Sequence, residues 1–119
     1  MKMECPLDYS LCDRTVTVYR LQAGQVLRTV VEGCFYRWQT ALRTDALGRR
    51  EETVFLLVMP GDTQRVFPGD RIYPGIGPEV SAQDWPRWLP VNVPGLAEAE
   101  YVSPHFWEGR LCHVEAGRK

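Results

Sequence analysis

The sequence has no long apolar run, and its longest uninterrupted apolar stretch extends only from Val54 to Met59. A helix needs about 20 apolar residues to cross a bilayer, so this pattern argues against a membrane protein. We also expect no secretory signal peptide, because Glu4, Pro6 and Asp8 interrupt the first ten residues. We therefore expect the protein to reside in the cytoplasm.

An excess of charge of either sign is missing as well. The 119 residues contain 14 Lys+Arg and 15 Asp+Glu, which gives a formal net charge of -1. Such a chain has no overall attraction to nucleic acid or to an anionic membrane. Its length and its 45% hydrophobic content predict one soluble domain, residues 1–119, with a core of its own.

Helical periodicity is absent, because ten Gly and nine Pro interrupt the chain along its whole length. Strand-like alternation is present instead, as in Arg14–Arg20, where Val16 and Val18 fall on one face. The sequence therefore predicts an all-β fold. We expect a small antiparallel β-barrel or β-sandwich of six or seven strands, with long loops and at most short helical turns.

Turn residues divide this expected sheet. A Gly-containing turn at Leu21–Gln25 joins the first two strands, and Gly33 marks a bulge or a corner before a third. A break is expected at Ser103–Pro104, before the last strand, 110–116. The alternation predicts a core built on Val16, Val18, Tyr36, Trp38, Val54, Leu56, Val58 and Ile72.

Three segments are expected to lie outside this sheet. Residues 1–12 form an amino-terminal arm, and the polar segment 41–50 is a protruding loop. Arg43, Arg49 and Arg50 in that loop are candidate partner-binding residues, since arginine forms forked pairs with carboxylates. The alternative is an ordinary hairpin with solvated charges.

The third segment is a Pro-rich wrapping loop at 75–94, which carries Trp85 and Trp88. Two interpretations of these tryptophans are open. The tryptophans either cover an open end of the barrel or anchor a partner, because tryptophan is frequent at interface hot spots.

No catalytic or metal-binding pattern is evident. Cys5 and Cys12 are separated by six residues, more than the usual spacing of zinc ligands, and adjacent Cys112 and His113 point to opposite faces of a strand. Without a secretory signal, the four cysteines are expected to be free thiols. We expect no metal, no cofactor and no enzymatic activity.

One competing function remains open. Arg37 lies among Phe35, Tyr36 and Trp38, a mixture that nucleic-acid-binding β-barrels use for base stacking. On a strand, however, half of these aromatic residues belong to a core. A nucleic-acid-binding module is therefore the alternative, and nucleic acid is the less favoured partner.

The order of several short motifs resembles small minor structural proteins of tailed phages and prophages of Gram-positive bacteria. These motifs are residues 1–8, 14–19, 33–38, 69–75 and 111–118. The resemblance implies a non-enzymatic head-tail connector or minor capsid component. Such a subunit would assemble with copies of itself and with other phage head or tail proteins, and would pass from the host cytoplasm into the virion. The resemblance assigns no functional residue.

Overall fold

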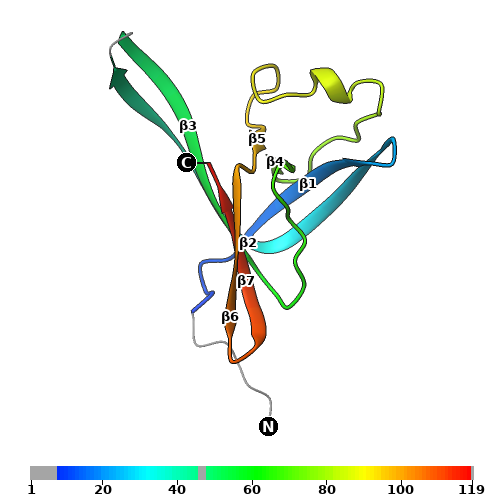
Figure 1. Cartoon of the computed structure of the whole chain (residues 1–119), viewed down its shortest axis with the longest axis vertical. Helices are drawn as coiled ribbons and strands as arrows, with labels where there is room; N and C mark the ends of the chain where they lie inside the picture. Colours follow the sequence, from blue (N-terminus) through cyan, green and yellow to red (C-terminus); the bar gives the residue numbers. More distant parts are fainter. Residues whose placement is uncertain (1–7, 46–47, 119) are drawn as a thin grey trace.

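The computed structural model describes residues 8–45 and 48–118, with the backbone alone between 39 and 53. It is all-β, as predicted: one antiparallel sheet of seven strands curls into a half-barrel (Figure 1). The strand order is β5-β4-β1-β2-β3-β7-β6. The strands are β1 Arg14–Gln22, β2 Gln25–Asp45, β3 Gly48–Pro60, β4 Arg71–Pro74, β5 Ala97–Glu98, β6 Tyr101–Trp107 and β7 Arg110–Gly117. Within the described ranges, no helix is long and apolar enough to cross a membrane.

The long strand β2 belongs to both halves of the sheet. Its first part pairs with β1 and its second part pairs with β3. Between them lies Gly33 with a φ of 74°, a backbone conformation that glycine adopts without steric strain. The pairing with β1 shifts in register near this point. The irregularity predicted at Gly33, a bulge or a corner, is thus confirmed, but the two strands expected around it are one continuous strand.

Two hairpins in this sheet turn through two residues each. Ala23 and Gly24 join β1 to β2, and Glu108 and Gly109 join β6 to β7. All four residues have positive φ, the backbone conformation of the turn that best matches strand twist. The predicted break at Ser103–Pro104 is wrong. β6 continues through this point because it is an edge strand, where a missing N–H is tolerated.

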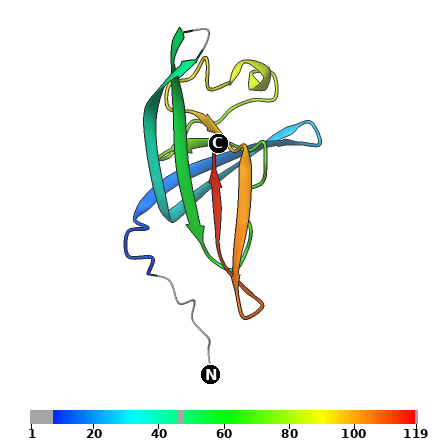
Figure 2. The ribbon, with the colours of Figure 1, turned by 60° about the vertical axis from the view of Figure 1, so that its left-hand side comes forward.

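The two edges of the curled sheet are linked directly by the chain (Figure 2). Ala99 and Glu100 connect the edge strand β5 to the opposite edge strand β6. Ala99 accepts a hydrogen bond from Gly69 N and donates one to Asp70 O, and Glu100 N donates to Gly117 O. These bonds draw the two halves of the sheet together at one end.

The core lies inside the curled sheet. Val16, Val18 and Ile72 are buried, as predicted. On β3, however, the predicted face is wrong, because Val54, Leu56 and Val58 are only half-buried. Among the described side chains of that strand, the buried ones are Phe55, Leu57 and Met59. Both alternating sets are apolar, so period two alone does not select the inward one.

The predicted aromatic core residues of β2 have different positions. Tyr36 is partly buried and packs against the core cluster. Trp38 is 48% exposed, so its assignment to the core is wrong. It lies where β2 leaves the curled part of the sheet, and there the core no longer covers that face.

Residues 41–45 and 48–50 are strand, which corrects the prediction of a loop over 41–50 and agrees with its alternative, a hairpin. Residues 41–45 of β2 pair with 48–52 of β3 in an unbroken antiparallel ladder. Pairing with β1 ends at Cys34 and pairing with β7 begins at Leu56. Among the described strands, residues 39–45 of β2 thus pair with β3 alone and residues 48–53 of β3 pair with β2 alone, and we call these two stretches the ribbon. Backbone hydrogen bonds extend it although its composition is polar, and Figure 1 shows it projecting from the sheet.

The Pro-rich segment 75–94 has no strand and one short 3-10 turn, Trp85–Arg87. This segment covers the outer face of β1. Thr17 Oγ1 donates to Gly75 O and accepts from Gly77 N, and Tyr19 OH donates to Pro78 O. β1 is therefore buried on both faces.

Candidate functional site

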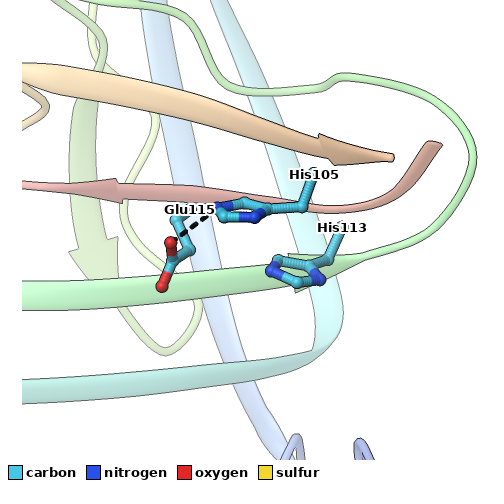
Figure 3. Close-up of side chains that lie close together, drawn as sticks. All are labelled: His105, His113 and Glu115. Carbon is cyan, nitrogen blue, oxygen red and sulfur yellow. Dashed lines mark hydrogen bonds and ion pairs between the residues drawn. The ribbon is translucent and has the colours of Figure 1, made fainter. Parts of the chain in front are cut away.

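Two histidines and a glutamate lie together on the hairpin of β6 and β7 (Figure 3). We call His105, His113 and Glu115 the β6–β7 cluster. The rings of His105 and His113 are stacked, with centroids 4.6 Å apart and planes at 15°. His105 Nε2 lies 2.7 Å from Glu115 Oε2. One ligand atom of each residue lies within 4.8 Å of the others.

Strand geometry brings these three residues to one face. His113 and Glu115 are two residues apart on β7, so their side chains share a face. His105 is the cross-strand partner of His113 on β6. The hairpin turn alone would oppose His105 to Cys112, because Trp107 opposes Arg110 and Phe106 opposes Leu111. A bulge between His105 and Phe106 shifts the register by one residue and brings the two histidines together.

Tyr9 fixes the inner histidine. Its hydroxyl lies 2.7 Å from His113 Nδ1, and the two rings meet edge to face. His113 is 6% exposed. Burial lowers its pKa below the usual histidine value, His105 lowers it further, and Glu115 acts in the opposite direction. His113 is therefore a neutral imidazole at neutral pH, with Nε2 as the ring nitrogen that Tyr9 leaves open.

The cysteines differ among themselves. Cys12 and Cys34 are free, as predicted, and burial raises the pKa of Cys34 to about 11. Cys112 is disulfide-bonded, so the prediction of a free thiol is wrong for this residue. Cys5 lies outside the described residues. Cys112 takes no part in the cluster.

The three predicted partner-binding arginines all lie on the ribbon. Arg43 and Arg50 are cross-strand partners, and Arg49 opposes Thr44. Their side chains are outside the described part of the molecule. The backbone register thus groups the arginines at one end of the ribbon, and their role in binding remains a prediction.

The two predicted tryptophans are built into the covering of β1. Trp88 packs against Tyr19 with ring centroids 4.4 Å apart, and it also stacks on Tyr73. The Arg71 guanidinium lies 3.7 Å from the Trp85 ring centroid and donates to the carbonyl oxygens of Trp85 and Trp88. These contacts place both tryptophans against β1 and β4 of the sheet, and their role as anchors for a partner stays a prediction.

Trp38 marks a separate surface at the base of the ribbon. It lines a pocket of about 750 Å³ together with Phe55 of β3 and with residues 89–91 and 94–98. Val91 on this rim is 86% exposed. The pocket combines exposed apolar groups with the carboxylates of Glu98 and Glu100, of which Glu100 is paired with Arg118.

Sequence reasoning missed His105, Glu115 and Tyr9 as members of one site. One signal was available, since His113 and Glu115 stand two residues apart in a segment predicted as a strand. Comparisons with protein-family models, with curated proteins and with solved structures found no match.

Proposed function

We propose that this chain is a non-enzymatic structural subunit of a tailed phage or prophage, a head-tail connector or minor capsid component that acts by assembly. The motif order described above suggests the phage class. The ribbon supports assembly as the mode of action. An isolated two-stranded hairpin is marginally stable in water, and no third described strand pairs with residues 39–45 or 48–53.

Contact with a neighbouring subunit would stabilise this ribbon. Both of its strands offer free backbone edges, which can accept an added strand from another chain. Its arginines are suited to carboxylates on a partner. Trp38 is exposed at its base, and exposed tryptophan is a common anchor in protein interfaces.

The test is assembly with the structural proteins encoded beside the gene, such as a portal, capsid or tail protein. Sedimentation velocity would compare the wild type with the triple variant Arg43→Ser, Arg49→Ser and Arg50→Ser. We expect this variant to keep its thermal stability within about 0.5 kcal/mol, as surface substitutions do, and to assemble at least tenfold more weakly.

A matched control removes three exposed arginines outside the ribbon, by Arg14→Ser, Arg37→Ser and Arg87→Ser. It changes the net charge equally and should assemble as the wild type does. If both triple variants assembled equally well, the ribbon arginines would have no part in the interface. Absence of any complex, together with salt-dependent binding of single-stranded DNA, would overturn the proposal in favour of the nucleic-acid-binding alternative.

A further inference from the structure

We propose that the β6–β7 cluster is a binding site for a divalent transition-metal ion of the zinc type. Its donors are two imidazoles and one carboxylate, a set that zinc accepts. No second group of three such residues occurs among the described ranges 8–45 and 48–118.

The cluster depends on an irregularity of the sheet. Without the bulge between His105 and Phe106, His105 would oppose Cys112 instead of His113. β-Bulges re-aim side chains and are frequent beside functional sites. Here the bulge places both histidines and Glu115 on one face of the hairpin, which a regular ladder would not do.

Ligand orientation is already fixed at the buried end of the cluster. Metal-binding histidines usually donate their second ring N–H to a nearby oxygen. In the tautomer that binds through Nε2, His113 donates from Nδ1 to the Tyr9 hydroxyl at 2.7 Å. His113 is also 6% exposed, so the surrounding chain holds its ring in place.

The outer ligands need only a small rearrangement. Zinc with bonds of about 2.0–2.2 Å holds its ligand atoms roughly 3.3 Å apart, against the 4.8 Å that spans this group. The His105 side chain is 45% exposed, so its ring is free to turn out of the stack over His113. The ion then replaces the hydrogen bond that links His105 to Glu115.

Three protein ligands leave a fourth zinc position open. A closed structural zinc site has four protein ligands, whereas an open one takes water or an outside group. The cluster lies beside the exposed edge strand β6. The fourth ligand is therefore solvent in the isolated subunit.

The experiment uses the full chain without a histidine tag, after removal of metals with a chelator. Isothermal titration calorimetry with ZnCl2 should give one ion per chain, and Co2+ should produce the visible absorption bands of a four-coordinate site. Zinc should also raise Tm, because an ion that binds only the folded state stabilises it.

Four variants identify the site. His105→Gln and Glu115→Gln should each weaken zinc affinity about tenfold or more, and Tyr9→Phe should weaken it roughly tenfold by loosening His113. Glu108→Gln, on the same hairpin but outside the cluster, should leave affinity unchanged. Failure of the wild type to bind zinc would overturn the proposal. So would wild-type affinity in His105→Gln, a substitution at a side chain that is 45% exposed.

Discussion

The Tyr36 hydroxyl is buried without a hydrogen-bond partner in the part of the chain that the structure describes. Burial raises the pKa of Tyr36 to about 12, so the phenol is neutral at every physiological pH. An unpaired buried hydroxyl costs free energy, because it gives up water without gaining a protein partner.

Tyr36→Phe should therefore leave the free energy of unfolding unchanged or raise it by up to about 1 kcal/mol. Tyr19→Phe is the matched control, because the Tyr19 hydroxyl donates to Pro78 O at 2.6 Å. That variant should lose about 1 kcal/mol. Urea denaturation measures both, and an equal loss in the two variants would contradict the account of Tyr36.

At the scale of the element, β3 offers two identical side chains on opposite faces. Leu57 is completely buried, and its neighbour Leu56 is half-buried. Leu57→Ala should cost about 2–5 kcal/mol of unfolding free energy, since it leaves a cavity in the core. Leu56→Ala should cost clearly less. Equal losses, measured by urea denaturation, would show that both faces of β3 are equally covered.

The strands themselves were largely predictable. Alternation identified β1, and turn residues identified both the Ala23–Gly24 turn and the corner at Gly33. The inward face of β3 was not predictable, because both of its faces are apolar. The ribbon was missed since its residues carry turn-like polarity, whereas backbone pairing that starts at the apolar base continues regardless of side-chain type.

The β6–β7 cluster could not be predicted from the sequence, and the reason lies in one irregularity of the sheet. His113 and Glu115 could be placed on one face from their spacing alone. The position of His105 depends on the bulge beside Phe106, and a shift of one residue moves a side chain to the other face. No residue type in that segment predicts the bulge.

At the scale of the whole molecule, the wrapping loop and the sheet should unfold as one unit. Trp88 packs on Tyr19 of β1, and Arg71 of β4 binds the carbonyls of Trp85 and Trp88. The loop therefore has no independent core that would let it open first.

This cooperativity is testable in a Trp38→Phe, Trp107→Phe background, where tryptophan fluorescence reports only on the loop. Denaturation followed by fluorescence should coincide with denaturation followed by far-UV circular dichroism, which reports on the strands. A fluorescence transition at a lower urea concentration would mean that the loop detaches while the sheet persists.

The continuity of β2 has a mechanical consequence. A force applied to the ribbon is transmitted along its two strands into different halves of the sheet. Along β3 it acts on the pairing with β7, and along β2 it passes the Gly33 corner into the pairing with β1. Strands that slide lengthwise must break several hydrogen bonds together, whereas a peeled strand releases them singly. Tension on the ribbon is thus shared by both halves of the sheet.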